Sequence, residues 1–150
     1  MNRFSLLCRV GVLLVAVGIL ALPDRASAEE RAYKSRSTAV LNLATGEFVA
    51  AGNATHLGKY TEIGNISISG DDPTALLVEG SATLTAANDD ELCVDFTGQM
   101  NFVTGTITAT ITFDGATDGH FKDATGSASL VAQVQPDGTI SVVVVGTIDY

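Results

Sequence analysis

The sequence predicts an all-β fold, an eight-stranded antiparallel up-and-down β-barrel, preceded by a signal peptide. Three observations predict the barrel. Beyond residue 28, apolar and polar residues alternate with a period of two, and no window shows the 3.6-residue period of a helix. Turn sequences rich in Gly, Asp, Asn and Pro separate the alternating segments. These segments number about eight, and a meander of that size can hide its edges by closing on itself. The alternative is a two-sheet sandwich, which uses the same alternation.

The first 28 residues are predicted to direct export. Arg3 and Arg9 give a basic start, and an uninterrupted apolar run follows at residues 10–22. Residues 26–28 are Ala-Ser-Ala, which places small side chains where signal peptidase requires them. We therefore expect cleavage before Glu29 and a periplasmic or secreted product.

Residues 29–150 are expected to form a single domain. The alternative to a cleaved signal is an anchor helix, but a helix needs about 20 apolar residues to span a bilayer. The apolar run is shorter and ends at Pro23, so we expect no membrane insertion after signal cleavage.

The net charge and the positions of the two histidines indicate which binding partners to expect. The chain has 8 Lys and Arg against 17 Asp and Glu, and its formal net charge is −9. Nucleic-acid binding requires clustered basic residues, so no nucleic-acid partner is expected. His56 and His120 lie far apart in the sequence without metal-ligand spacing around them, so we expect neither a metal nor another cofactor.

In the first half of residues 29–150 we expect four strands, at residues 37–43, 47–57, 59–69 and 75–87. The second alternates through Phe48 and Ala50, and the third through Tyr60 and Ile66. The fourth follows a turn at residues 70–73, Gly-Asp-Asp-Pro, which favours a change of chain direction.

The second half supplies the other four, at residues 91–102, 105–113, 123–135 and 139–149. The strand at 105–113 is the clearest, because Ile107 and Ile111 share one face while threonines occupy the other. The apolar faces should point inward, since the opposite faces are mostly Thr, Ser and Asp. Eight strands enclose an interior that side chains can fill or that can hold one small ligand.

Residues 118–126, Asp-Gly-His-Phe-Lys-Asp-Ala-Thr-Gly, resemble the G-x-F-x-x-A-x-G turn of the allene oxide cyclase and dirigent-protein barrels. The order of elements is similar over most of the chain, and it looks closer to small secreted bacterial relatives than to the plant enzymes. The resemblance implies a calycin-like barrel with a central cavity and, from the plant members, a homo-oligomer. Phe121 would plug one barrel end and Ala124 would leave room for its ring. No catalytic residue of the family maps onto this chain.

The alternation along two neighbouring strands predicts that three residues form a candidate ligand-binding site. His56, Tyr60 and Glu62 fall on the same inward face as apolar neighbours, on both sides of a turn at residues 57–59. An imidazole, a phenol and a carboxylate could together orient or protonate a ligand. The alternatives are that these strand ends are solvated, or that a bulge at Gly58 or Gly64 reverses the alternation.

Three functions remain open. The first is binding of a small apolar or amphipathic ligand in the lumen, because many inward positions are Ala or Gly and would leave space. The second is an allene oxide cyclase-like or dirigent-like isomerase or cyclase, which works by confinement and needs no nucleophile. The third is a packed structural or surface-interaction barrel with a Thr-rich outside. We favour a binding protein over an enzyme.

Overall fold

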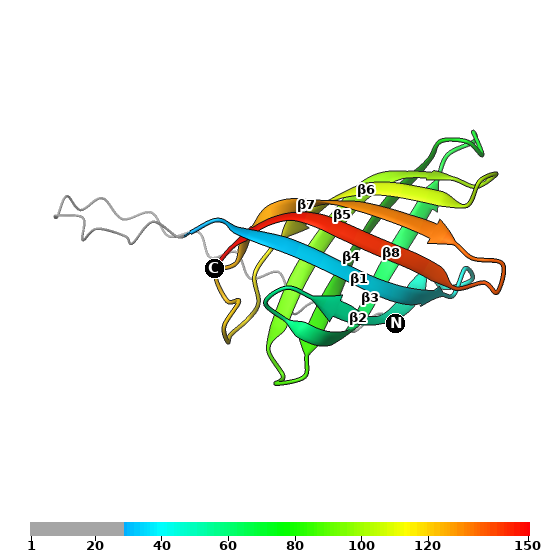
Figure 1. The fold of residues 1–150 in the computed structure, drawn as a ribbon. Coiled ribbons are helices and arrows are strands. Elements are labelled where there is room, and N and C mark those ends of the chain that lie inside the picture. Colours follow the sequence, from blue (N-terminus) through cyan, green and yellow to red (C-terminus); the bar gives the residue numbers. More distant parts are fainter. Residues whose placement is uncertain (1–28) are drawn as a thin grey trace, which may run out of the picture.

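The computed structural model describes residues 29–150 and confirms the all-β class. Eight strands form a closed barrel in which each pairs antiparallel with its sequence neighbour and β8 pairs with β1 (Figure 1). The strands are β1 Arg31–Leu41, β2 Glu47–Ala54, β3 Gly58–Ser69, β4 Leu76–Ala86, β5 Glu91–Asn101, β6 Thr106–Phe113, β7 Thr125–Val134 and β8 Ile140–Asp149. The predicted signal at residues 1–28 lies outside the described residues. Within residues 29–150, no helix is long and apolar enough to cross a membrane.

Two strand boundaries differ from the sequence prediction. β1 begins at Arg31 instead of residue 37, because inward positions such as Ser35 and Ser37 continue the alternation with polar side chains. β2 ends at Ala54 instead of residue 57, because His56 adopts a left-handed backbone with φ of 72°. The other predicted strands match within about two residues, the margin usual for strand ends.

The early start of β1 is what closes the barrel. β1 pairs with β8 from Arg31 opposite Ile148 to Ala39 opposite Ile140. A strand that began at residue 37 would leave most of β8 without a partner on that side. Closure instead satisfies the backbone hydrogen bonds of both strands and removes the exposed edges.

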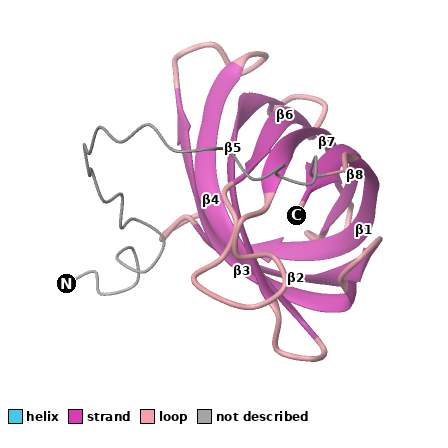
Figure 2. Ribbon diagram, turned by 90° about the vertical axis from the view of Figure 1, so that its left-hand side faces the viewer, coloured by secondary structure: helices cyan, strands magenta, loops and turns pink. Residues whose placement is uncertain are grey.

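The up-and-down order divides the connections between two ends of the barrel. We call one the closed end; it carries residues 55–57, 87–90 and 114–124 and both ends of the described chain. The other, the open end, carries residues 42–46, 70–75, 102–105 and 135–139. Figure 2 views the ring of strands with the closed end towards the reader. The longest connection, 114–124, therefore lies at the closed end.

The side chains inside the barrel form two clusters. The cluster towards the closed end is rich in large residues and includes Tyr33, Leu92, Phe113, Phe121 and Ile148. The cluster towards the open end contains Val78, Met100, Ile107 and Ile140 together with three alanines, Ala39, Ala50 and Ala132. The lumen is thus filled by larger side chains at one end than at the other.

Candidate functional site

A cavity of about 80 Å³ lies inside the barrel, mostly in the half towards the open end, and Val94 and Ile111 of the closed-end cluster complete its lining. Fifteen of its 16 lining residues are Ala, Val, Leu, Ile or Phe, and the other is Glu62. Alanines at positions 39, 50, 109 and 132 explain the space, because longer side chains there would fill it. An engineered apolar cavity of about 150 Å³ holds benzene, so this cavity, at about half that volume, encloses only a short segment of a slender group such as an alkyl chain, and the rest of a longer chain would extend towards the open end.

The cavity reaches towards the open end. Leu41, the last residue of β1, and Ile140, the first of β8, belong to its lining. Glu62 lies deeper, in the middle of β3, where it pairs with Ala50 on one side and Leu84 on the other. The site therefore combines an apolar wall near the opening with one carboxyl group further inside.

Glu62 is a half-buried acid in apolar surroundings. Within residues 29–150 its carboxyl group has no hydrogen-bond or ion-pair partner. Desolvation by the apolar wall raises the pKa of Glu62 from 4.5 to about 7. This residue can therefore gain or lose a proton near neutral pH.

Tyr60 belongs to a buried hydroxyl cluster on β1 and β3. Tyr60 is hydrogen-bonded with Ser37 and Ser35, and Tyr33 with Ser35. Burial raises the pKa of both phenols, so both stay neutral at physiological pH. Gly52 makes the contact across β2 possible, because a Cβ at that position would lie 2.6 Å from the Cβ of Ser37.

The predicted placement of Tyr60 and Glu62 inside the barrel is confirmed, whereas that of His56 is wrong. His56 is exposed at the closed end, where its Nε2 lies 3.0 Å from the carbonyl oxygen of Ala32, to which it donates. The alternation fails there because the strand has already ended and the backbone is left-handed. That Tyr60 and Glu62 bind a ligand stays a prediction.

The closed end is plugged by aromatic side chains. Phe121 is 1% exposed and Ala124 is 2% exposed, as expected for a ring that enters the barrel beside a small residue. The ring centroid of Tyr150 lies 4.9 Å from that of Phe121, 4.8 Å from that of His120 and 5.5 Å from that of His56. Arg31 lies over the same Tyr150 ring at 4.5 Å.

Sequence spacing gave no sign that the two histidines share a neighbour. His56 lies between β2 and β3 and His120 between β6 and β7, and barrel closure brings both to Tyr150. Among residues 29–150, no group of three or more His, Cys, Asp or Glu side chains is arranged to hold a metal ion.

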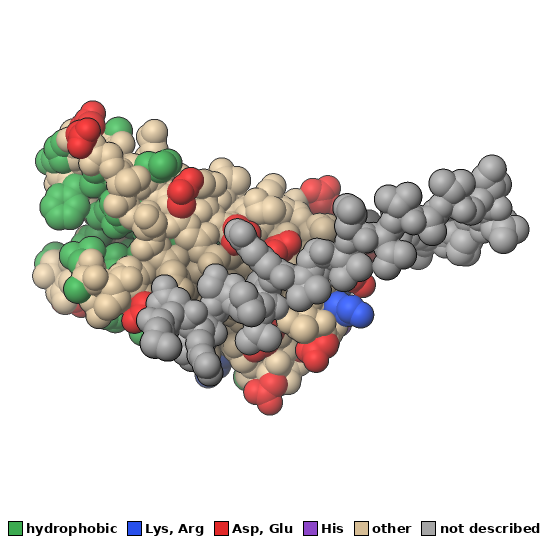
Figure 3. Space-filling model, turned by 180° about the vertical axis from the view of Figure 1, so that it is seen from behind, with side chains coloured by type: hydrophobic (Ala, Val, Ile, Leu, Met, Phe, Trp, Pro, Cys, Tyr) green, Lys and Arg blue, Asp and Glu red, His purple; other side chains and the backbone are tan. Residues whose placement is uncertain are grey.

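The open end is apolar and acidic. Leu43, Phe102 and Val103, in its turns, are 71%, 60% and 73% exposed. Figure 3 shows hydrophobic side chains gathered at this end of the molecule. The four connections at this end and the first residue of β2 include no Lys or Arg. Their acidic residues are Glu47, Asp71, Asp72 and Asp137.

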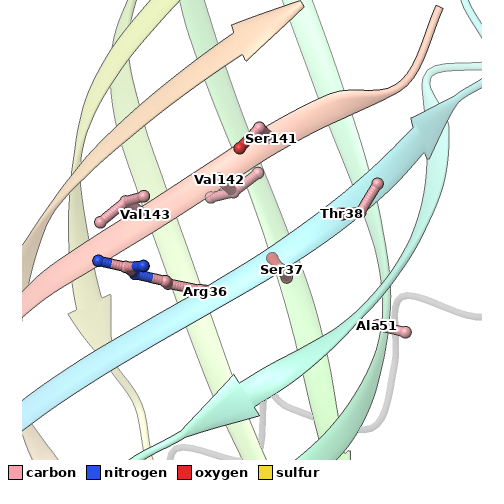
Figure 4. A pocket seen from close by; sticks show the side chains of 7 residues that line it. All are labelled: Arg36, Ser37, Thr38, Ala51, Ser141, Val142 and Val143. Carbon is pink, nitrogen blue, oxygen red and sulfur yellow. The ribbon is translucent and has the colours of Figure 1, made fainter. Parts of the chain in front are cut away.

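A second depression lies on the outer wall of the barrel, over β1, β2 and β8 (Figure 4). It has a volume of about 310 Å³, is open to solvent, and is lined by residues that include Arg36, Thr38 and Ser141. Arg36 is its only charged side chain, so it offers no pair of acid and base. The lumen, which encloses a carboxyl group in apolar surroundings, is the better candidate site.

These features define a class of protein, the small closed up-and-down barrel with an internal cavity. Comparison of the chain with models of known protein families gives no match, and comparison with curated proteins gives none either. The resemblance of residues 118–126 to the allene oxide cyclase and dirigent barrels stays a prediction.

Proposed function

We propose that this protein is an exported barrel that binds a slender apolar or amphipathic molecule in the open half of its lumen. The observation that carries the proposal is the cavity, apolar except for Glu62. A lumen that served only as packed core would be filled to the density of other protein interiors. The exposed Leu43, Phe102 and Val103 give an apolar ligand favourable contacts as it enters.

The driving force would be the hydrophobic effect. Removing an alkyl chain from water contributes about 0.8 kcal/mol per methylene group. A chain of six methylenes contributes at most about 5 kcal/mol, with the part that the cavity cannot enclose covered by the apolar rim, before the entropic cost of association is subtracted. Affinity should therefore rise with chain length until the chain outgrows the lumen and its apolar rim.

Titration calorimetry with linear 1-alkanols of increasing length tests the proposal on the protein and two matched variants. Ala109→Leu fills the cavity, whereas Ala51→Leu adds the same atoms to the outer face of β2. We expect the wild type and Ala51→Leu to bind, and Ala109→Leu to bind at least tenfold more weakly. Failure of the wild type to bind any alkanol, or equal binding by the two variants, would contradict a lumenal site.

A second candidate is an isomerase or cyclase of the allene oxide cyclase-like or dirigent-like kind. The observation that favours it is Glu62, because an acid with a pKa of about 7 can donate or accept a proton at neutral pH. Glu62→Gln separates the two functions: an enzyme would lose turnover of its substrate, while a binding protein would retain alkanol binding. His56 is exposed at the closed end, outside the lumen, so neither proposal assigns it a role.

A further inference from the structure

We propose that the preferred ligand is a cationic amphiphile, a linear alkyl chain ending in a primary ammonium group that pairs with Glu62. The chain would lie against the apolar wall and point towards the open end. This inference rests on the proposed lumenal binding function and names the chemical class of its ligand.

The first support is the lack of a partner for Glu62. An ionised carboxylate in an apolar cavity is unfavourable unless a cation or hydrogen-bond donors neutralise it. Within residues 29–150, neither reaches its carboxyl group. An ammonium group supplies one positive charge and three donors, so the ligand would provide what the protein lacks.

The second support is the negative charge of the open end, which the closed end shares. The closed end carries nine Asp and Glu residues in its connections, chain ends and flanking strand ends, against four basic residues, Arg31, Lys34, Lys59 and Lys122. The charged side chains of the open end are all acidic, such as Asp71 and Asp137. The open end therefore attracts a cation and repels a fatty-acid carboxylate, as the net charge of the whole barrel does.

The third support is the order of surfaces along the lumen. From the open end inward, a ligand meets the exposed rim residues Leu43 and Phe102, then the apolar wall, and then Glu62. An amphiphile that enters head first would place its charged group beside Glu62 and its tail along the wall and rim. The reverse orientation would leave the carboxyl of Glu62 against a hydrocarbon chain.

The pH dependence follows from the groups that face this space. The other titratable side chains on the inner face within residues 29–150 are Tyr33 of β1 and Tyr60 of β3, both neutral below pH 9 because burial raises their pKa. Of these three inner-face groups, only Glu62 changes charge between pH 5 and 8. Ammonium binding requires its ionised form, so affinity should fall about tenfold for each pH unit below its pKa.

The experiment compares decylammonium, 1-decanol and decanoate by titration calorimetry with the full protein, below their micelle concentrations and at physiological salt. Glu62→Gln is the test variant. Glu79→Gln is its matched control, because it removes the same charge from the exposed face of β4. At pH 8 we expect decylammonium to bind the wild type and Glu79→Gln at least tenfold more tightly than 1-decanol does, with decanoate weakest.

Glu62→Gln should abolish this preference and change 1-decanol affinity less than threefold. Lowering the pH to 5.5 should weaken decylammonium binding to the wild type at least tenfold, and this measurement needs no variant. Binding of 1-decanol without an ammonium preference, a preference that survives Glu62→Gln, or tighter binding of decanoate would overturn the inference and leave the proposed function standing. If none of the three probes binds, the proposed function itself fails.

Discussion

Inside the closed end, the lumen is filled by the rings of Tyr33, Phe113 and Phe121, whereas inside the open end the corresponding space borders alanines such as Ala39 and Ala132. Both ends have the same alternation of inward and outward side chains. The period of two thus determines which side chains point inward, and their volume determines whether that part of the lumen is core or cavity. We infer that the closed end stabilises the barrel and the open end is available for a ligand.

The two ends also differ at the surface. Arg31 contacts the Tyr150 ring at the closed end, where Lys59 and Lys122 lie among more numerous acidic residues. The open end combines acidic residues with exposed apolar ones. Exposed apolar side chains that are grouped together mark interaction sites more often than isolated ones do. The predictions below test whether stability and binding are divided between the ends in this way.

The largest expected difference is between two phenylalanines. Phe121→Ala should lower the free energy of unfolding by about 3–5 kcal/mol, because it leaves a cavity in the plug of the closed end. Phe102→Ala at the open end should change the free energy of unfolding by less than about 0.5 kcal/mol, because its ring is 60% exposed. Urea denaturation measures both. Equal losses would show that the open-end turn is as important to the fold as the plug.

The next effect concerns Glu62 and depends on pH. Burial raises the pKa of Glu62 from 4.5 to about 7 in the folded chain. The free energy of unfolding therefore falls at a pH where Glu62 is ionised in the unfolded chain but still protonated in the folded one. The penalty is absent below pH 4.5, grows as the pH rises to 7, and reaches about 3 kcal/mol above that. Glu62→Gln should therefore be more stable than the wild type at pH 8 and equal to it at pH 4.

Urea denaturation of both proteins across this pH range measures the difference. The control is Glu79→Gln, which should show no comparable gain because Glu79 is exposed. A gain for Glu62→Gln that did not vary with pH would mean that packing, and not the charge of Glu62, causes it.

The fold class and the inward placement of Tyr60 and Glu62 could be predicted because alternation is unbroken along these strands. The start of β1 could not, because Ser35 and Ser37 face inward without the apolar character that marks such positions. His56 was misplaced because the pattern cannot reveal where the backbone turns left-handed. Alternation indicates an extended strand and the face that each residue occupies, but it does not show at which residue the strand ends.

Two features depend on which strand ends and turns share an end of the barrel. Tyr150 contacts both His56 and His120 because strands distant in sequence end at the same rim. The absence of basic residues from the open end of the described barrel likewise follows from which turns share that end. To predict either feature, one needs the strand order and the strand bounds. The sequence predicts the strand order, but it predicts the bounds less accurately.

A smaller effect is expected at the wall of the cavity. The ring of Phe48 covers Gly64, and a Cβ at Gly64 would lie 2.5 Å from its Cζ. Gly64→Ala should displace the ring towards the lumen, lower the free energy of unfolding by about 1–3 kcal/mol, and weaken alkanol binding. Adding Phe48→Leu should recover part of both losses, since the smaller side chain relieves the clash. If the second substitution recovers nothing, the contact of the new Cβ with the carbonyl oxygen of Ser81, at 2.6 Å, is the dominant cause.

The smallest expected effect tests whether the two ends are independent. Tyr150→Leu removes the ring that contacts Phe121, His120 and Arg31, but it keeps an apolar side chain there. Each aromatic contact contributes about 0.5–1.5 kcal/mol, and the exposure of the histidines reduces this, so we expect a total loss near 1 kcal/mol. Thermal or urea denaturation measures that loss, while alkanol affinity should stay within twofold of the wild type because the cavity belongs to the other half of the lumen. A larger change in affinity would show that the packing of the plug reaches the cavity, and the closed end would then share in binding.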